Sequence, residues 1–403
     1  MRKRSKRAQS IRPAGREKAA AGIDPARYGF QMALLTPSQT YYNHSFPLSA
    51  RTAQDLATIL PPSTPFIAEG FGTSGRLFFM ELARLNYPCK ELNPKLGRHL
   101  RLLEQEGHTD AGDAAAIAKA EFLFPNRLAP ITLSESREAL ATLTKSRRRL
   151  VKGKTADKNR LHVLLSESYG ALYKTLKAKI SINTKHGRRF FHRFPSINAL
   201  LASPEGEGEL AFFFQKDAHA LIRAEKPWTS TIYLEALEEE ARLLLDHIEA
   251  TEKMTEELKK KITTVLPSQK DAHLLLSIPG VGPISAATIL SEMKTIDRFP
   301  SEAKFAGYCG LGQLVFQSGE QSSGFKKRTM YNRALKGAFF DVAFSAISKS
   351  GLARTYYCKK RQEGKTHRQA LLRLARYYAR IVYSVLKKQK TYQDIFPEQE
   401  VAL

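Results

Sequence analysis

The first third of the chain contains strand-like and helix-like segments in a fixed order. Three strands are predicted first, in AAAGID, YGFQMALLT and TYYNHSFPL, with a turn at Pro25 after the first of them. Helical spacing follows in RTAQDLATIL, then a buried strand in TPFIAEG that ends at Glu69, a helix in GRLFFMELARLN and a strand in YPCKELNP. A three-stranded antiparallel meander followed by alternating helices and strands predicts a mixed α/β sheet.

Two long helical stretches are predicted in the middle of the chain. One runs from about Leu133 to Leu176 and contains the basic cluster KSRRRLVKGK. The other, IYLEALEEEARLLLDHIEATEKMTEELKKKI, has leucine and isoleucine at heptad-like spacing. We expect the two to pair as an antiparallel coiled coil, with smaller helices and loops in the segment between them.

The last third of the chain begins with LLLSIPGVGPISAATILSEM, in which a Pro-Gly-Val-Gly turn joins two apolar helical runs. This pattern indicates a helix-hairpin-helix, whose glycines Gly280 and Gly282 and helix-start amides can bind a phosphate backbone. The alternative is a tight helical turn packed in a core.

The charge of the chain favours a polyanionic partner. Lys and Arg number 64 against 39 Asp and Glu, which gives a formal net charge of +25 and a pI near 9.9. Nucleic acid is the partner that such a balance favours. Two basic clusters are candidate nucleic-acid contacts, Arg147, Arg148 and Arg149 in the first long helix and Lys326, Lys327 and Arg328 in the last third. Lys and Arg attract either backbone, so the sequence does not assign RNA to one cluster and DNA to the other.

Cysteine usage and hydropathy limit the cellular compartment expected for the protein and the covalent or metal sites it can contain. No stretch reaches the 18 to 20 consecutive apolar residues, roughly, that span a bilayer, so we expect a soluble, intracellular protein with no membrane partner. The three cysteines Cys89, Cys309 and Cys358 are far apart and odd in number. That pattern argues against a disulfide framework and against a zinc site.

Asp110 and Asp113 lie three residues apart in HTDAGDAAAIAKA. On a helix they share a face, so their like charges repel. One interpretation is that acids in a first helical turn meet the helix dipole, and that one of them caps the helix. The other is that the pair binds a divalent cation, because magnesium prefers hard oxygen ligands.

Two further acids lie at predicted strand ends, Asp24 on the first strand and Glu69 on the fourth. In an open α/β sheet functional groups cluster near the ends of strands, so these acids can converge with the aspartate pair. Four such carboxylates suit two-metal phosphoryl chemistry, in which two ions about 3.5 to 4 Å apart stabilise the attacking and leaving oxygens. The order of acids and elements resembles the RNase H-like fold of the RuvC type.

From about Ala21 to Lys387 the chain resembles the insertion-sequence one-ten family, the DEDD transposases related to the Piv invertase and described as bridge-RNA-guided recombinases. The N-terminal motifs are GID, AEGFG, LNPK and TDAGDAAAIA, and the C-terminal motifs are LLSIPGVGPISAATILSEM, DRF, FAGYCGL and QSG. The resemblance implies that the metal-binding, catalytic acids are Asp24, Glu69, Asp110 and Asp113, and that Ser318 in FQSG is a serine nucleophile.

The resemblance also implies a mechanism and partners. It predicts Mg²⁺ as cofactor, double-stranded DNA as substrate, a structured guide (bridge) RNA, and a covalent phosphoserine bond to DNA. The two halves of the site combine across protomers in this family, which predicts a homo-oligomer, a dimer of dimers, in the prokaryotic cytoplasm. Downstream of the serine the sequence KRTMYNRALKG departs from the family pattern, so the roles of Asn332 and Arg333 stay open.

Two other functions remain open at this point. A RuvC-like junction resolvase or nuclease would cut DNA with metal-activated water and would use Ser318 only structurally. A non-catalytic RNA or DNA binder would use its charge through counterion release, with the acids as helix caps. Cleavage and covalent attachment of DNA separate the three.

The predicted organisation is α/β plus α. Five segments are expected, namely a basic flexible arm at 1–18, a RuvC-like domain at 19–130, a helical coiled-coil region at 131–265, a helical C-terminal transposase domain at 266–390, and a tail at 391–403.

Overall fold

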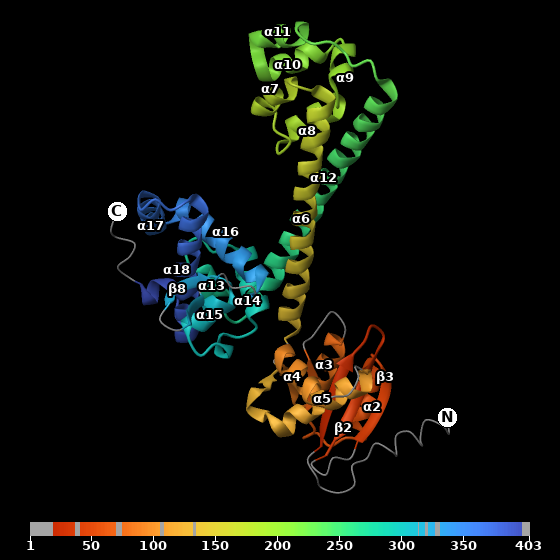
Figure 1. Cartoon of the computed structure of the whole chain (residues 1–403), viewed down its shortest axis with the longest axis vertical. Helices are drawn as coiled ribbons and strands as arrows, with labels where there is room; N and C mark the ends of the chain where they lie inside the picture. Colours follow the sequence, from red (N-terminus) through yellow and green to blue (C-terminus); the bar gives the residue numbers. More distant parts are fainter. Residues whose placement is uncertain are drawn as a thin grey trace. The chain divides into compact units, whose positions relative to one another are not determined.

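The computed structural model (Figure 1) describes residues 19–36, 41–69, 75–104, 109–131, 134–312, 314–318, 321–326 and 331–396. By its internal contacts the chain divides into two units. The first consists of Met1–Glu138, Leu290–Asn332 and Ala379–Lys388, and the second of Ala139–Ile289, Arg333–Tyr378 and Gln389–Leu403. The arm predicted at 1–18 and the tail beyond residue 396 lie outside the described residues.

The first unit contains a six-stranded sheet, red to orange in Figure 1, with the strand order β3-β2-β1-β4-β5-β6. Its strands are β1 (Ala20–Pro25), β2 (Gly29–Leu35), β3 (Tyr41–Pro47), β4 (Phe66–Glu69), β5 (Cys89–Leu92) and β6 (Ala129–Pro130). The first three strands are antiparallel neighbours, β4 and β5 run parallel to β1, and β6 is antiparallel to β5. The predicted mixed α/β sheet is therefore confirmed.

Four helices cover the two faces of this sheet. They are α2 (Ala50–Ala57), α3 (Arg76–Arg84), α4 (Pro94–Glu104) and α5 (Asp110–Leu123), and the short η1 (Pro125–Arg127) follows α5. Side chains of α2 and α3 pack with Ile23, Met32 and Phe66 on one face. Side chains of α4 and α5 pack with Ala20 and Ile67 on the other. Alternate residues of β1 therefore pack into two separate apolar cores, one beneath α2 and α3 and one beneath α4 and α5. The strand is thereby held between the two helix layers.

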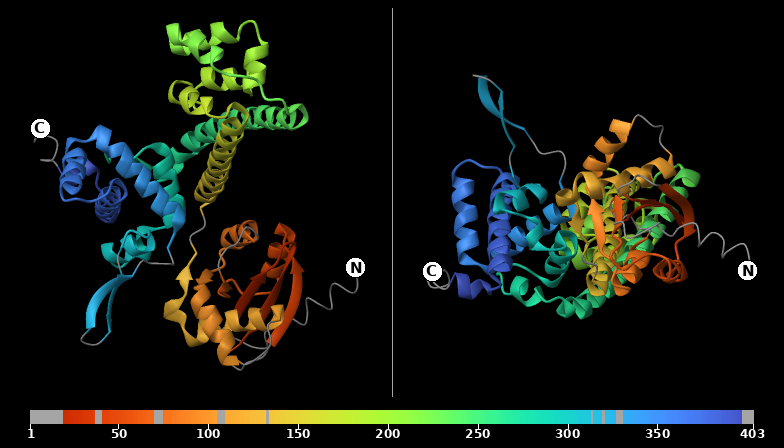
Figure 2. Two further views of the ribbon diagram at one scale, coloured as in Figure 1. Left: turned by 45° about the horizontal axis from the view of Figure 1, so that its top comes forward. Right: turned by 90° about the horizontal axis from the view of Figure 1, so that it is seen from below.

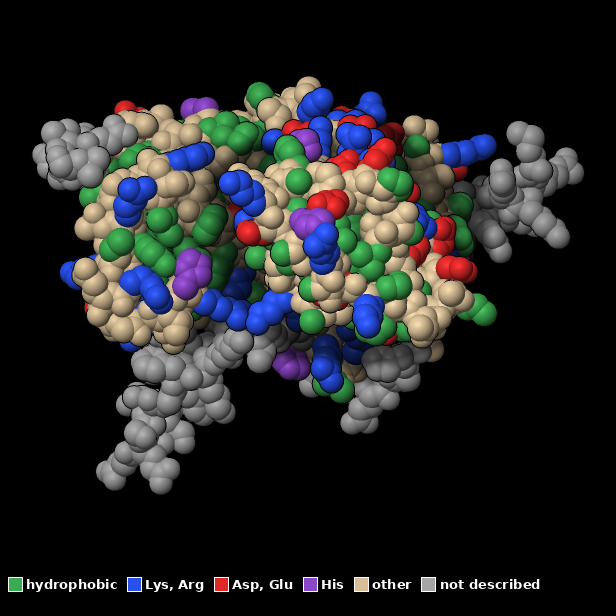
Figure 3. All heavy atoms as spheres, turned by 90° about the horizontal axis from the view of Figure 1, so that it is seen from above, with side chains coloured by type: hydrophobic (Ala, Val, Ile, Leu, Met, Phe, Trp, Pro, Cys, Tyr) green, Lys and Arg blue, Asp and Glu red, His purple; other side chains and the backbone are tan. Residues whose placement is uncertain are grey.

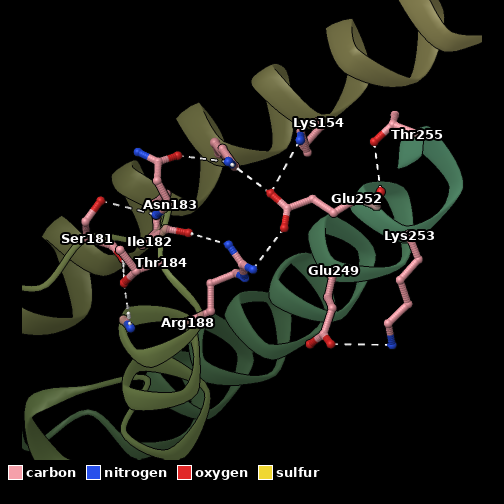
Figure 4. A network of polar contacts seen from close by, with 12 residues as sticks. Lys154, Ser181, Ile182, Asn183, Thr184, Arg188, Glu249, Glu252, Lys253 and Thr255 are labelled. Carbon is pink, nitrogen blue, oxygen red and sulfur yellow. Dashed lines mark hydrogen bonds and ion pairs between the residues drawn. The ribbon is translucent and has the colours of Figure 1, made fainter. Parts of the chain in front are cut away.

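The second unit contains the two long helices predicted from the sequence, α6 (Glu135–Tyr169), which begins at the end of the first unit, and α12 (Thr231–Val265). They pair in opposite directions. Along α6 the paired residues rise from Lys154 to Glu167, while their partners in α12 fall from Glu252 to Tyr233. Figure 4 shows one of these contacts, in which Glu252 of α12 accepts from Lys154 at 3.4 Å.

Five short helices lie between the two long ones, as predicted. They are α7 (Leu172–Lys179), α8 (Lys185–Arg193), α9 (Ile197–Ala202), α10 (Gly206–Phe214) and α11 (Ala218–Arg223), with η2 (Gln215–Asp217) before α11. We call residues 172–223 the cap. Its core joins aromatic side chains of α8 to Leu245 and Ile248 of α12, so the cap and the end of the helix pair form one apolar cluster. Arg188 of α8 is buried and contacts Glu252 at 2.9 Å.

The remaining elements are helical apart from one hairpin. The helices are η3 (Leu266–Ser268), α13 (Ala272–Leu276), α14 (Pro283–Met293), η4 (Ile296–Arg298), α15 (Glu302–Tyr308), α16 (Arg333–Lys349), α17 (Gly351–Gln362), α18 (His367–Lys388) and α19 (Tyr392–Ile395). The strands β7 (Leu314–Ser318) and β8 (Gln321–Lys326) pair with a register shift between Phe316 and Ser318. Both views of Figure 2 show this hairpin extending away from α15. The sequence analysis predicted only a helical domain for residues 266–390, so the hairpin corrects that expectation.

The helical C-terminal prediction is confirmed, and the turn between α13 and α14 has the geometry of a packed turn. Gly280 is buried at a φ of 91°, and a Cβ there would lie 2.7 Å from the Cβ of Ala346 in α16. Within the described ranges no helix combines the length and the apolar character needed to cross a membrane.

Candidate active site

Asp24 and Glu69 lie at the same edge of the sheet. Asp24 is the penultimate residue of β1 and Glu69 is the last residue of β4. The two strands are parallel and adjacent, and their last paired residues are Ile23 and Ala68. The residues that follow, Asp24 and Glu69, therefore stand beside each other where both strands end.

Asp110 and Asp113 lie in the first turn of α5, but neither is its N-cap. That place is taken by Thr109, whose side-chain oxygen accepts from the Gly112 amide at 3.1 Å. Asn43 of β3 also binds this end of the helix, because its Nδ2 donates to the Ala111 carbonyl oxygen at 3.1 Å. The interpretation of one aspartate as a helix cap is therefore wrong, and both carboxylates are available for another role.

The alanine-rich sequence of α5 brings these aspartates close to the sheet. A Cβ on Gly22 of β1 would lie 2.1 Å from the Ala114 carbonyl oxygen and 2.4 Å from the Ala118 amide nitrogen. The helix backbone thus packs directly on the strand backbone, which only glycine on one side and small residues on the other permit. Because Gly22 lies two residues before Asp24, the same contact places the start of α5 over the end of β1.

The four carboxylates lie near enough to one another for their charges to interact. Burial raises the pKa of Asp24, the negative charges of Asp113, Asp110 and Glu69 raise it further, and Arg101 opposes them. Mutual repulsion at one sheet edge is the condition that a bound cation relieves. The donor set fits a divalent metal such as Mg²⁺, since all four groups offer hard oxygen ligands.

Arg101 of α4 is the cation that meets these acids in the structure. Its guanidinium forms two hydrogen bonds with the Glu69 carboxylate, one of them from Nη2 to Oε1 at 3.2 Å, and its Nε lies 3.7 Å from Oδ1 of Asp113. Among the described residues no three metal-binding side chains are gathered tightly enough to hold one ion in this arrangement. Arg101 was missed by the sequence analysis, because nothing in LNPKLGRHLR separates it from other basic residues.

The absence of a side chain at Gly97 lets the Glu69 carboxylate lie directly against α4. Gly97 lies one helical turn before Arg101, on the same face, and a Cβ there would lie 2.5 Å from Oε2 of Glu69. The Glu69 carboxylate therefore rests on bare helix backbone while it bonds to Arg101. The motif LNPK quoted above runs from the end of β5 into the first turn of α4, and Gly97 follows it by two positions, so this glycine was the signal that the sequence offered.

The other candidate residues lie apart from these acids in the sequence. Ser318 is the last residue of β7 and pairs with Gln321, and Lys326 is the last residue of β8. The side chains of both, and the whole of Lys327 and Arg328, lie outside the described residues. The Asn332 side chain donates from Nδ2 to Glu292 at 2.8 Å, and its backbone amide donates to the Tyr308 carbonyl oxygen. The side chain therefore has a structural role in this contact. Arg333 is the first residue of α16.

The candidate nucleic-acid contacts differ in their exposure. Arg148 and Arg149 are exposed on α6, whereas Arg147 is half-buried and its charge lowers the pKa of Asp341 in α16 against the raising effect of burial. Gly280 packs on α16 as described, whereas a Cβ on Gly282 would meet open space. Among the members whose side chains the structure describes, Arg148 and Arg149 are exposed to an approaching backbone, and half-buried Gly282 has open space beside it.

Comparisons with known proteins match both halves of the chain. A DEDD transposase profile of the IS110 type, described as Transposase, matches residues 21–169, and the profile Transposase IS116/IS110/IS902 family matches residues 272–358. The insertion element IS110 uncharacterized 43.6 kDa protein of Streptomyces coelicolor is 28% identical over 72% of this chain and 74% of its own. The insertion element IS116 uncharacterized 44.8 kDa protein of Streptomyces clavuligerus is 26% identical over 74% and 75%. The mini-circle putative transposase for IS117 of Streptomyces coelicolor is 23% identical over 84% and 83%.

Proposed function

The chain belongs to the IS110/IS116 family of transposases, and from that premise we propose that Asp24, Glu69, Asp110 and Asp113 form the site at which it cuts DNA. A transposase cleaves and rejoins DNA, so the protein is an enzyme of DNA transposition. The observation that carries the proposal is the placement of four carboxylates from β1, β4 and α5 near one sheet edge, where Arg101 contacts both Glu69 and Asp113. The strand order, with an antiparallel meander and two parallel strands, supports an RNase H-like domain of the RuvC type for residues 19–130.

The carboxylates would hold Mg²⁺ beside the scissile phosphate. When bound, such a cation supplies charge stabilisation to the phosphate oxygens. Asp24 and Glu69 are fixed by the strands that carry them, and Asp110 and Asp113 by the contact between Gly22 and α5. Arg101 now contacts Glu69 and Asp113, so these two carboxylates would be oxygen donors for a cation only once Arg101 no longer holds them.

Ser318 is the proposed nucleophile for the exchange of strands. Its Oγ would attack the phosphorus, form a phosphoserine bond to one DNA end and release the hydroxyl of the other, so that the energy of the phosphodiester is kept for rejoining. Its position as the last residue of β7 supports this role, because functional residues are often found where a regular element gives way to a connecting segment. Hydrolysis by water at the same carboxylates, as in a junction resolvase, is the competing reaction.

A structured guide RNA and a dimer of dimers complete the proposal. The net charge of +25 supports binding of two polyanions, and the exposed Arg148 and Arg149 are candidate contacts for either. Light scattering of the protein with RNA and DNA tests the assembly: a tetramer is expected, and a monomer at every ratio would contradict it.

The experiment that tests the chemistry expresses the protein from its native locus and denatures it in detergent, and then measures DNA that stays covalently attached. Wild type is compared with Ser318→Ala and Asp113→Asn, and with Asp55→Asn as the control. Asp55 is an exposed acid of α2 that pairs with Arg51 at 3.9 Å on the surface. We expect an adduct in wild type and Asp55→Asn, and none in the other two.

The remaining outcomes separate the alternatives. Cutting without an adduct in both wild type and Ser318→Ala would support a nuclease that uses water and would remove Ser318 from the chemistry. Binding without cutting in every variant, including wild type supplied with its RNA, would support a non-catalytic binder and would contradict the carboxylate site.

A further inference from the structure

The cap contains a cavity that the proposed DNA-cutting site does not use. It has a volume of about 550 Å³ and lies between α8 and α10. That size is within the range of pockets that hold small organic groups, roughly 300 to 1,000 Å³. Figure 3, which views the molecule from the side of the cap, shows basic, acidic, histidine and apolar side chains intermixed on this face.

Much of the cavity lining consists of aromatic side chains. Phe212 is 69% exposed, and its ring lies 5.7 Å from that of His186 with an interplanar angle of 31°. Phe213 and Phe190 also line the cavity, with ring centroids 5.7 Å apart, and Phe190 is buried in the cap core. A large aromatic ring that is left exposed beside a rigid aromatic base is a stacking surface for a second flat ring.

The polar groups of the lining suit the edge of a nucleobase better than an isolated phosphate. Arg193 contacts both Glu205 and Glu209, the latter at 3.1 Å, so two carboxylates are held at the rim as acceptors. Arg189 is exposed and makes no hydrogen bond or ion pair with another described residue. Carboxylates accept from exocyclic amino groups, and an arginine donates to base carbonyl oxygens or to the adjoining phosphate.

We propose that this cavity binds an unpaired base of single-stranded nucleic acid, stacked on Phe212 and His186 and contacted by Arg189. The geometry excludes a base inside a duplex, because both faces of a stacked base pair are covered by its neighbours. The inference rests on the proposed function for the nature of the partner, a nucleic acid, and adds a second, non-catalytic site for it.

Gly208 offers a way to block the cavity without removing any of these groups. It lies in the first turn of α10 and lines the cavity, and a Cβ there would meet no atom within 4 Å. Gly208→Leu therefore adds a large side chain to the cavity lining, where we expect it to compete with a base for space, and its Cβ would contact no neighbouring residue. It also removes a glycine from a helix, which favours folding.

The test uses full-length protein and single strands of about 16 nucleotides that carry one fluorescent 2-aminopurine, in RNA and in DNA form. Stacking quenches this base, and anisotropy of an end label gives the affinity. We expect quenching by wild type, its loss in Phe212→Ala and Gly208→Leu, and binding weakened roughly 5- to 100-fold in Phe212→Ala. The preferred strand identifies RNA or DNA as the source of the base.

Arg189→Gln has a matched control in Arg223→Gln. Arg223 is an exposed arginine of α11 in the same cap that does not line the cavity. We expect Arg189→Gln to weaken binding and Arg223→Gln to leave the quenching unchanged. Equal quenching and affinity in wild type, Phe212→Ala and Gly208→Leu would overturn the inference.

Cleavage of duplex element ends is measured in parallel, so that failure of the two proposals can be told apart. If the cap variants match wild type in quenching while Asp113→Asn alone stops cleavage, the inference fails and the proposed function stands. If the cap variants lose quenching while Asp113→Asn cleaves normally, the base site stands and the carboxylate site fails.

Discussion

Replacing Arg101 tests whether a guanidinium holds the carboxylates together in the absence of metal. In Arg101→Gln the two bonds to Glu69 and the attraction to Asp113 are lost, and four acids face one another without a cation. Breaking a buried ion pair from one side costs about 3 to 5 kcal/mol. The Arg101 and Glu69 side chains are 21% and 18% exposed, so solvent reduces the expected loss to about 1.5 to 3 kcal/mol.

The assay is thermal unfolding in EDTA and then in Mg²⁺. A loss of that size lowers the Tm of a domain of this size by roughly 4 to 10 °C. In wild type, Mg²⁺ binding must first break the contacts of Arg101 with Glu69 and Asp113, and in Arg101→Gln it does not. Mg²⁺ should therefore raise the Tm of Arg101→Gln by more than it raises the Tm of wild type. Arg84→Gln is the control, since Arg84 is 81% exposed and lies 3.4 Å from Glu81 at the surface. An unchanged Tm in EDTA, or a Mg²⁺ gain no larger than in wild type, would refute the reasoning.

Three further changes follow from the packing and the charges. Gly22→Ala should cost about 3 kcal/mol or more, because its Cβ would overlap the backbone of α5, whereas Gly153→Ala, which meets no atom within 4 Å, should be neutral or stabilising in denaturant titrations. Gly97→Ala should displace Glu69 and abolish DNA cutting with a much smaller change in Tm, and retained cutting would show that Glu69 has room to move. Burial raises the pKa of Glu252, but Arg188, Lys154 and Lys158 lower it by more. The stability that ionised Glu252 contributes is therefore fully present above its unfolded-state pKa of about 4.3. It is lost as the pH falls through the lower pKa of the folded state. Glu252→Gln should flatten acid unfolding below pH 5, roughly, and Glu249→Gln at the surface pair with Lys253 should not.

The sequence predicted the sheet because its order depends on local patterns. The short apolar run of β1, the strand-like segments of β2 and β3 and the acids Asp24 and Glu69 at strand ends are visible in the sequence, and so is the aspartate pair of α5. The long helices were also visible, since heptad spacing is a repeating signal. These features carry four of the groups in the candidate site.

What the sequence did not predict depends on contacts between distant residues. Arg101 became part of the site only because α4 packs beside β4, and no pattern in its own segment indicates an acidic partner. Thr109 displaced the aspartates as the cap because a hydroxyl one residue earlier has the geometry to accept from Gly112. The cavity of the cap likewise forms only where α8 and α10 come together, and from the sequence alone the aromatic residues of each helix indicate only a buried core.

The network around Glu252 (Figure 4) also determines which register the two long helices adopt. Heptad patterns repeat, so a shift of α12 by seven residues would restore apolar contacts while moving the helix about 10 Å along its neighbour. Such a shift would separate Glu252 from Lys154, Lys158 and Arg188 at once, and would leave the buried guanidinium of Arg188 without its carboxylate. The single acid therefore discriminates between otherwise equivalent alignments, and the position of the cap along the helix pair has one value rather than several.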